Sequence, residues 1–396
     1  MRRILTPERK DWKTTAERMG FKFHTIDGER YWDETACYAF TLAQIDNDIE
    51  APTNEIHAMT LALVDEVVGK EELLEKLAIP RAYWDLIARS WKEKQPHLYG
   101  RMDFSYDGTG PAKLLELNYD TPTSLFEASV FQWVWLKEQI ELGVLPEDAD
   151  QYNLLHESLV LAFSTLAVEK RLNGPLYMAA VREAIEDQAT VDYLQECAVQ
   201  AGLTTRRLAL EDIGLSTDGY FTALNDGVSS TDEVIQTLFK LYPLEAMFTE
   251  EGGPALLSSG IQLIEPVWKA ILSNKGVLPL LWERHKGHPN LLPAYFEVKG
   301  ETSDLPPDWV RKPLFSREGA NVQMRLTDGT EVASDGPYDD APFIRQACHP
   351  LPRYDGGFPL VGSWVVGDRA CGMGIREDAT LITRDTSRFL PHIILD

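Results

Sequence analysis

Apolar residues recur at helical spacing over the first quarter of the chain. The run 41–69 places them three and four residues apart, a pattern typical of a helix with one buried face. Pro80 precedes a second run of this kind, which predicts that a helix restarts there. We therefore expect residues 1–98 to be largely helical. The aromatic side chains predicted to lie in the core of this part are Tyr83, Trp84 and Trp91.

Residues 98–121 change to the alternation that is typical of strands. Two alternating runs flank the turn sequence Asp-Gly-Thr-Gly at 107–110, which predicts a β-hairpin. If positions 107 and 110 pair, Arg101 lies opposite Glu116 and position 103 lies opposite 114. Alternate residues of a strand share a face. The residues predicted on the common face are Arg101, Asp103, Ser105, Leu114, Glu116, Asn118 and Asp120.

The rest of the chain combines helical runs with short strands. Residues 124–142 and 153–171 have helical spacing, whereas 175–210 read as strand, helix and strand. Further strand and helix runs follow up to about position 290. The last part predicts a mainly antiparallel sheet, with a connector over 298–308. Its predicted strands are WVRKPLF, ANVQMRL, APFIRQAC, PLVGSWVV, RACGMGI and ATLITRD. The fold class is α+β, or mixed α/β.

The net charge of the chain narrows the classes of molecule expected to bind it. The 396 residues include 38 Lys and Arg against 62 Asp and Glu, a formal net charge of −24. Such a surface repels nucleic acid and anionic lipid, and it suits cationic partners such as polyamines or metal ions, although acidity also simply improves solubility. No apolar run is long enough for a membrane span, and no secretory signal is recognisable. The four cysteines form no pair or Cys/His cluster, so we expect reduced thiols in a cytoplasmic protein.

Oxygen ligands and scattered cations are the candidate chemistry. The Asp, Glu and Asn side chains of the hairpin suit Mg²⁺, although a solvated face with an Arg101–Glu116 ion pair explains them equally. Lys275, Lys312 and Arg376 could neutralise phosphates, or each could form a surface ion pair. A turn after Lys312 could cover phosphates with its backbone amides; its polar members are Ser316, Arg317, Gly319 and Asn321. Walker A, G-x-G-x-x-G, G-x-S-x-G and H-E-x-x-H patterns are absent from the sequence.

Five motifs in order resemble one family over nearly the whole chain. They are RMD (101–103), LLELNYDTPTS (114–124), SNKGVLPLLW (273–282), RKPLFSREGANV (311–322) and GMGIRED (372–378). Together they resemble the synthetase part of the glutathionylspermidine synthetase family, which includes stand-alone acid–amine ligases. The resemblance implies an ATP-grasp fold with a helical and α/β pre-ATP-grasp portion. The implied portions are a helical part at 1–97, a hairpin and pre-ATP-grasp part at 98–289, and a sheet-rich ATP-grasp part at 290–396, with one nucleotide site between lobes.

The resemblance also implies roles for residues of this chain. Asp103, Glu116 and Asn118 match the family's Mg²⁺ ligands. Arg101 matches the arginine beside the transferred phosphoryl group, and Arg376 the arginine near the γ-phosphate; both are implied to be catalytic. The residues implied to bind ATP are Arg101, Met102, Asp103, Lys275, Lys312, Glu318, Gly319, Gln346, Ala347, Cys348, His349, Arg376, Leu381, Ile382 and Thr383. The residues implied to hold the acid substrate are Thr121, Thr123, Glu186 and Asp187, the last two of which could instead attract a polyamine.

Three departures from the family pattern limit what carries over. The two-domain members bear an N-terminal amidase with a Cys–His pair, for which this chain has no room, so amide hydrolysis is expected to be missing. Glu318 stands where bifunctional members have cysteine, and Leu241 stands where a glutathione-contacting threonine is expected. These departures leave the implied ATP chemistry intact. They leave open which acid and which amine the protein joins.

The resemblance implies an ATP-dependent carboxylate–amine ligase. ATP would convert a carboxylate into an acyl phosphate, which an amine then attacks, and a lid near 313–322 would exclude water. The expected co-substrate and cofactor are ATP and Mg²⁺, and the expected partners are a small peptide or glutathione-like acid and a polyamine-like amine, with no nucleic acid or membrane. The alternatives are a non-catalytic protein that binds nucleotide or polyamine through a degenerate site, and a hydrolase using a carboxylate pair. The oligomeric state stays open.

Overall fold

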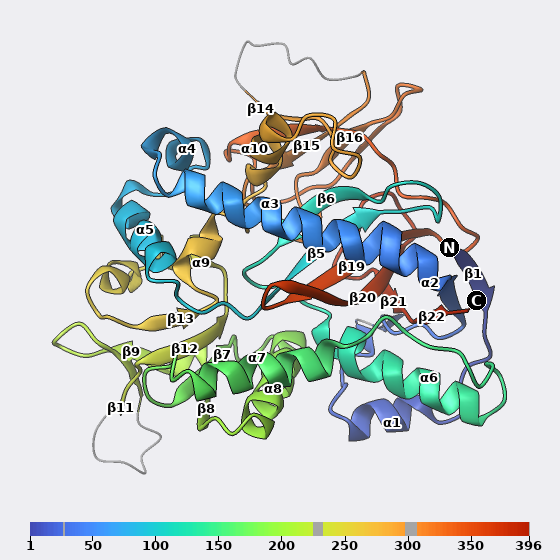
Figure 1. Cartoon of the computed structure of the whole chain (residues 1–396), viewed down its shortest axis with the longest axis horizontal. Helices are drawn as coiled ribbons and strands as arrows, with labels where there is room; N and C mark the ends of the chain where they lie inside the picture. Colours follow the sequence, from blue (N-terminus) through green and yellow to red (C-terminus); the bar gives the residue numbers. More distant parts are fainter. Residues whose placement is uncertain (27, 225–232, 298–306, 396) are drawn as a thin grey trace.

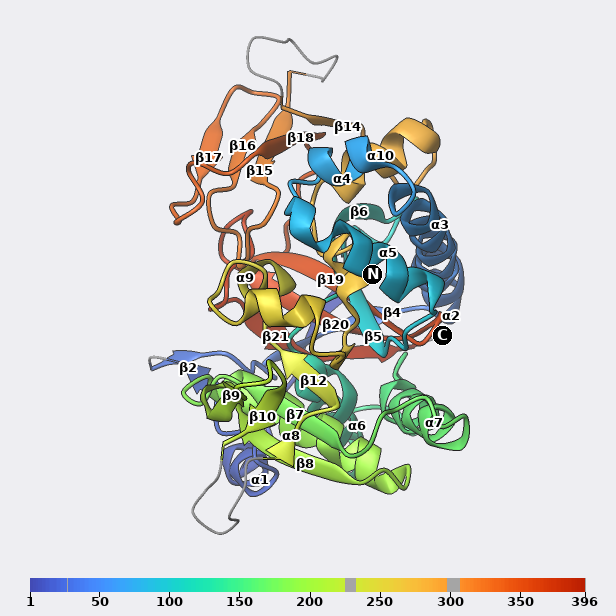
Figure 2. The same cartoon turned by 90° about the vertical axis from the view of Figure 1, so that its left-hand side faces the viewer.

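The computed structural model describes residues 1–26, 28–224, 233–297 and 307–395. Three larger sheets lie one above another, with helices packed around them (Figures 1 and 2). Most of the predicted connector 298–308 lies outside these residues. No helix in the described part of the chain is long and apolar enough to cross a membrane.

The central sheet is antiparallel, with the strand order β21-β20-β19-β5-β6. Its strands are β5 (Tyr99–Ser105), β6 (Lys113–Asn118), β19 (Phe358–Val366), β20 (Arg369–Asp378) and β21 (Arg388–Leu390). The predicted hairpin therefore pairs directly with strands of the last quarter of the chain. Gly362 of β19 leaves room for a neighbour, because a Cβ there would lie 2.9 Å from Cδ of Arg101.

The upper sheet in Figure 1 is also antiparallel and contains three of the six strands predicted for the last part of the chain, whereas PLVGSWVV and RACGMGI join the central sheet. Its order is β14-β18-β15-β16-β17. Its strands are β14 (Ala294–Phe296), β15 (Trp309–Pro313), β16 (Gln323–Arg325), β17 (Glu331–Ala333) and β18 (Phe343–Ala347). The helix α10 (Val277–Arg284) packs against β14 and β18.

The lower sheet is parallel and contains the predicted strand–helix–strand unit. Its order is β13-β12-β7-β8, formed by β7 (Leu176–Ala180), β8 (Thr205–Ala209), β12 (Thr237–Leu241) and β13 (Gln262–Ile264). The helices beside it are α6 (Gln132–Glu141), α7 (Leu155–Val168), α8 (Ile185–Gln200) and α9 (Leu244–Met247). This part also contains one π-helix, η3 (Glu127–Phe131), and three short 3₁₀-helices, η4 (Leu210–Asp212), η5 (Gly253–Leu257) and η6 (Val267–Ala270). A small sheet is formed by β9 (Ile213–Leu215), β10 (Phe221–Ala223) and β11 (Glu233–Val234).

Residues 41–92 are mainly helical, as predicted, whereas residues 1–40 are not. The helical elements are α2 (Leu42–Gln44), η1 (Ile45–Glu50), α3 (Ala51–Val67), α4 (Glu71–Lys76), η2 (Arg81–Tyr83) and α5 (Trp84–Lys92). The first forty residues instead contain β1 (Arg2–Leu5), β2 (Thr25–Ile26), β3 (Glu29–Arg30) and β4 (Ala36–Phe40), with one short helix α1 (Trp12–Arg18). β4 is buried between β1 and the distant β22 (His392–Ile394), a pairing that no local pattern announces. Tyr83 is buried as predicted, whereas Trp84 and Trp91 are only partly buried.

The predicted hairpin register is wrong by two residues at its functional end. Arg101 pairs with Asn118 and Asp103 with Glu116, because the connection spans more than the four turn residues and a bulge interrupts β6 at Leu115. A shift of two keeps the polar side chains on one face. The bulge moves Leu114 to the other face, where it pairs with Phe104 and is fully buried.

The segment ATLITRD is not a strand. Residues 379–387 form a loop between β20 and β21, and Ile382 at its centre packs on Val310, Val322 and Met324. The apolar residues Leu381 and Ile382 of this segment line a pocket instead of pairing in a sheet.

Candidate active site

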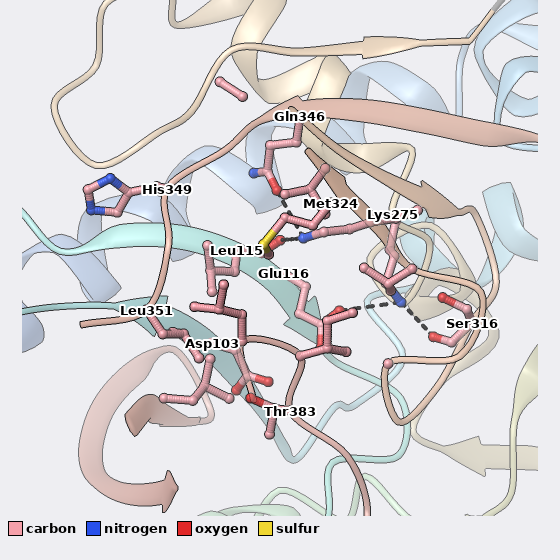
Figure 3. A pocket seen from close by; sticks show the side chains of 18 residues that line it. Asp103, Leu115, Glu116, Lys275, Ser316, Met324, Gln346, His349, Leu351 and Thr383 are labelled. Carbon is pink, nitrogen blue, oxygen red and sulfur yellow. Dashed lines mark hydrogen bonds and ion pairs between the residues drawn. The ribbon is translucent and has the colours of Figure 1, made fainter. Parts of the chain in front are cut away.

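A cavity of about 100 Å³ lies between the central and upper sheets (Figure 3). Strands β5, β6, β15 and β18 and the loops after β15 and β20 supply its walls. Eleven of the predicted site residues line it: Asp103, Glu116, Lys275, Lys312, Gly319, Gln346, Ala347, His349, Leu381, Ile382 and Thr383. Residues of the first four motifs thus meet at one place with the segments 346–349 and 381–383, whereas the fifth motif, GMGIRED, contributes none of the lining.

Asp103 is held from two sides. Nε of Arg101 donates to one of its carboxylate oxygens at 2.7 Å, and Nη2 donates to the other at 3.0 Å. Nδ2 of Asn118 donates to the second oxygen at 3.0 Å. Burial disfavours the charge of Arg101, but Asp103 outweighs burial and raises the pKa of the guanidinium. This pairing fixes the orientation of the carboxylate at the floor of the pocket.

Two lysines face Glu116. Lys275 Nζ lies 3.3 Å from its carboxylate and donates to the carbonyl oxygen of Ser316 at 2.5 Å (Figure 3). Burial alone would raise the pKa of Glu116, but Lys275, Lys312 and Arg101 together lower it to about 2. Glu116 is therefore ionised at any physiological pH.

Lys312 projects from β15 into the same pocket. Its Nζ donates to the carbonyl oxygen of Leu115 at 2.8 Å and to Oε1 of Gln346 at 3.0 Å. Burial lowers the pKa of Lys312 to about 8, and Lys275 adds to the shift while Glu116 opposes it. The three cations and two carboxylates of this centre sum to a net positive charge, which suits a chain of phosphates.

An apolar wall faces these charges. It is formed by Val310, Val322, Met324 and Ile382. Of these four residues, only Ile382 is among the site residues named from the sequence. Gln346 crosses the end of this wall and donates to the carbonyl oxygen of Leu114 at 3.1 Å. A flat base could pack on such a wall with an amide at its edge.

The loop after β15 covers the pocket. Glu318, Gly319 and Asn321 have positive φ, and a Cβ on Gly319 would lie 2.7 Å from the carbonyl oxygen of Thr383. Arg317 ties this loop to the lower part of the site, because its guanidinium donates to Oγ1 of Thr121 at 2.5 Å and to Glu245 at 2.8 Å.

Arg376 lies beside the pocket rather than in it. It lines a small space together with Arg101, Asp103 and Ser124, and it donates to the carbonyl oxygens of Arg384 and Asp385. Its Nε is buried and has no hydrogen-bond partner in the described part of the chain. The backbone of Thr123 reaches the same place, since its carbonyl oxygen accepts from Nη1 of Arg101 at 2.7 Å.

A group of carboxylates adjoins Arg376. Burial and the neighbouring Glu127 raise the pKa of Glu186 to about 7, while burial and Glu318 raise that of Asp187 to about 6. Glu127 accepts a 2.5 Å hydrogen bond from the hydroxyl of Tyr31, and its other oxygen is buried without a partner among the described residues. Glu127 is not among the site residues named from the sequence. The feature that could have identified it is that Glu127 is the one charged residue in the apolar run 124–136.

Other residues named from the sequence also lie outside the pocket wall. The side chain of Met102 is fully buried in the core on the opposite face of β5. Cys348 packs behind the apolar wall, next to Ala347. Leu241 is buried in β12.

The donor set fits Mg²⁺ only together with phosphates. Asp103 and Glu116 lie opposite each other on paired strands, and ionised carboxylates keep acceptor sites beyond the hydrogen bonds described. No group of three His, Cys, Asp or Glu side chains in the described ranges could hold a metal alone. Mg²⁺ typically uses one or two carboxylates and the phosphates of a bound nucleotide, which these residues can provide.

Proteins similar to this chain in fold or in sequence are known. A glutathione synthetase-like effector of Globodera pallida, solved in the apo form, superposes with a TM-score of 0.59 at 10% identity, covering 97% of this chain and 96% of that one. This likeness concerns the fold. A Haemophilus influenzae protein named "Putative acid--amine ligase" is 42% identical over 98% of this chain and 97% of its own length.

Longer relatives match over part of their length. Trypanothione synthetase of Crithidia fasciculata is 27% identical over 85% of this chain, and the bifunctional glutathionylspermidine synthetase/amidase of Escherichia coli is 25% identical over 87%. The chain spans 53% and 57% of these two proteins, about half of each.

The fold and these sequence relatives define the class: an ATP-grasp enzyme that forms carbon–nitrogen bonds. The family model described as "Glutathionylspermidine synthase preATP-grasp" matches residues 3–395. The chain belongs to this family, whose synthetases are ATP-dependent amide ligases.

Proposed function

We propose that the chain joins a small peptide or glutathione-like acid to a polyamine-like amine through an acyl phosphate, with Mg²⁺ and without amidase activity. The observation that carries this proposal is the meeting of Asp103, Glu116, Lys275 and Lys312 around one covered pocket with an apolar wall. When bound, Mg²⁺ would supply positive charge to the phosphates of ATP from a position on Asp103, Glu116 and Asn118.

The side chains account for the steps of the reaction. Lys275 and Lys312 would bind the phosphates, and the apolar wall with Gln346 would bind the base. Arg101, oriented by Asp103, would stabilise the transferred phosphoryl group and then the oxyanion formed when the amine attacks. Arg376 has an uncommitted Nε beside Arg101 and would assist at the same oxygen atoms.

The covering loop would admit the nucleotide and then exclude water. A cavity of about 100 Å³ is well below the roughly 300 Å³ or more of most ligand pockets, so ATP entry requires its walls to move. The segment 316–322 carries three residues with positive φ and few sheet contacts, which makes it the part proposed to move. Closure protects the acyl phosphate from hydrolysis.

The thiols support the proposed lack of amidase activity. Burial raises the pKa of Cys37, Cys197 and Cys371 to about 12, and that of Cys348 to about 11. Sγ of Cys197 lies 3.8 Å from Nδ1 of His156, but a thiol that keeps its proton is a poor nucleophile.

Calorimetric titration with ATP tests the nucleotide site. Because the centre is net positive without phosphates, Mg²⁺ alone is expected to bind weakly, whereas Mg²⁺ with ATP gives saturable binding. ADP release should then require an acid and an amine together, and glutathionylspermidine should not be hydrolysed. Saturable ATP binding with no ADP release in any acid and amine pool would favour the non-catalytic alternative, and no ATP binding would remove the proposal.

The acidic group should make substrate affinity depend on pH. Glu186 and Asp187 would hold an ammonium group, either the amino end of the acid or the amine. Their raised pKa values mean that both lose charge as pH falls through 7 and 6. The KM of the substrate they hold is expected to rise about tenfold between pH 7.5 and 5.5, while the KM of the other substrate changes little. Measuring both KM values across this range assigns the group, and two flat profiles would contradict its role.

A further inference from the structure

A second cleft, far larger than the first pocket, is lined by residues of α5, α7 and the turn that joins β19 to β20. Figure 1 labels these helices and strands. Its volume is about 830 Å³, within the range of pockets that hold small organic ligands. A neighbouring cleft of about 600 Å³ shares Lys94, Gln95, Pro96 and Arg171 with it. We call the two together the basic cleft. None of its lining residues belongs to the candidate active site.

The walls of the basic cleft are apolar and partly aromatic. Trp91 and Trp268 meet edge to face with ring centroids 5.0 Å apart, and Leu161 on α7 is 68% exposed at the facing side. The indole N–H of Trp91 donates to Asp65 at 2.8 Å, which fixes the ring. A flat apolar group can lie between a fixed tryptophan and an exposed leucine.

The rim of the basic cleft carries unpaired cations. Five exposed side chains line it and form no ion pair with any carboxylate of the described residues: Arg89, Lys92, Lys94, Lys170 and Arg369. Four carboxylates also line the cleft: Asp368 lies 3.2 Å from His57 and 3.3 Å from His97, Glu169 lies 3.5 Å from Arg171, Asp65 accepts from Trp91, and Glu93 accepts from Gln95. With Arg171, six lysines and arginines line the cleft against these four carboxylates. A local excess of free cations stands out in a chain with a net charge of −24.

The helix dipole accounts for only some of the cations that line the basic cleft. Arg89 and Lys92 lie in the last turn of α5, where the helix dipole favours cations. Lys170 and Arg369 lie outside any helix, and Arg369 begins β20 on the opposite wall. Cations on three separate elements therefore converge on one apolar cleft.

We propose that the basic cleft binds an organic anion with a flat apolar group, at a site separate from the nucleotide pocket. The flat group would pack against Trp91 and Leu161, and the negative charge would be neutralised by Lys92, Lys94 and Arg369. Nucleotides and aromatic carboxylates share this chemistry.

Titration of the full chain with 1-anilinonaphthalene-8-sulfonate, an aromatic anion, tests the proposal by fluorescence. Saturable binding at one site is expected. The variant K92Q/K94Q/R369Q should bind the probe about tenfold more weakly, since each exposed charge contributes roughly 0.5 kcal/mol. The matched control K10Q/R18Q/K22Q removes two lysines and one arginine that are exposed elsewhere, and it should bind as the wild type does.

A second pair of variants tests the apolar wall without threatening the fold. Leu161→Asp should weaken the probe, whereas Val168→Asp, on an exposed residue of the same helix that does not line the cleft, should not. Displacement by AMP would identify a nucleotide, and displacement by phenylacetate an aromatic carboxylate. Probe binding that does not saturate, or that survives both K92Q/K94Q/R369Q and Leu161→Asp, would overturn the proposal.

Discussion

Replacing Lys312 by methionine is expected to weaken ATP binding at least about 100-fold, because it removes a buried charge from the centre proposed to bind the phosphates. Lys312 is 7% exposed, and its ammonium group donates to Leu115 and Gln346 in the neighbourhood of Glu116. Methionine is one atom shorter than lysine but keeps an unbranched apolar stem that can pack at this position of β15. The loss of affinity should therefore come without a large loss of stability.

Arg311 provides the control for this change. It precedes Lys312 on the same strand, points to the other face and pairs with Glu297 at 2.7 Å. Arg311→Met removes one cation from the same strand and should leave ATP binding within about twofold of the wild type, as an exposed ion pair contributes little. Calorimetry with Mg²⁺ and ATP measures both variants. Equal affinities for Lys312→Met and Arg311→Met would show that Lys312 does not bind phosphate.

Asp103→Asn is expected to lower turnover about 1,000-fold while nucleotide binding falls much less. The amide cannot accept both hydrogen bonds from Arg101, so the guanidinium loses its orientation, and one carboxylate near the phosphates is lost. The effect should appear in kcat, because orientation and charge matter most when the phosphoryl group moves.

Asp107→Asn is a suitable comparison for this second change. Asp107 lies on the exposed connection of the same hairpin and caps Thr109 locally. Rates of ADP release and thermal unfolding midpoints should be measured for both variants. If Asp103→Asn turned over as fast as Asp107→Asn, the assignment of the site to this hairpin face would be wrong.

Local patterns predicted much of the fold because helices 41–92 and the parallel unit 175–210 depend on neighbours in sequence. They missed β4, which pairs with β1 and, across more than 350 residues, with β22. They also missed the bulge at Leu115, which turns two successive residues of β6 toward the pocket. Local pattern predicts a strand at ATLITRD (379–385), but its apolar residues Leu381 and Ile382 belong to a pocket wall.

The candidate site was predicted better than the fold around it. The motifs named the charged residues, and the structure brings Asp103, Glu116, Lys275 and Lys312 within one pocket. The apolar wall was missed because Val310, Val322 and Met324 look like ordinary strand residues in sequence. Glu127 and Tyr31 were missed because a buried pair formed by distant segments has no local signature.

The internal pairing of charges in the nucleotide pocket has a consequence for inhibitor design. Arg101 is satisfied by Asp103, Lys275 by Glu116 and Ser316, and Lys312 by Leu115 and Gln346 before any ligand enters. A competitor of ATP need not bring phosphates or any other negative group. A neutral heterocycle that packs on Val310, Val322, Met324 and Ile382 and hydrogen-bonds at Gln346 would leave these pairs intact. Such a compound would avoid the cost of breaking them and could cross membranes that exclude nucleotide analogues.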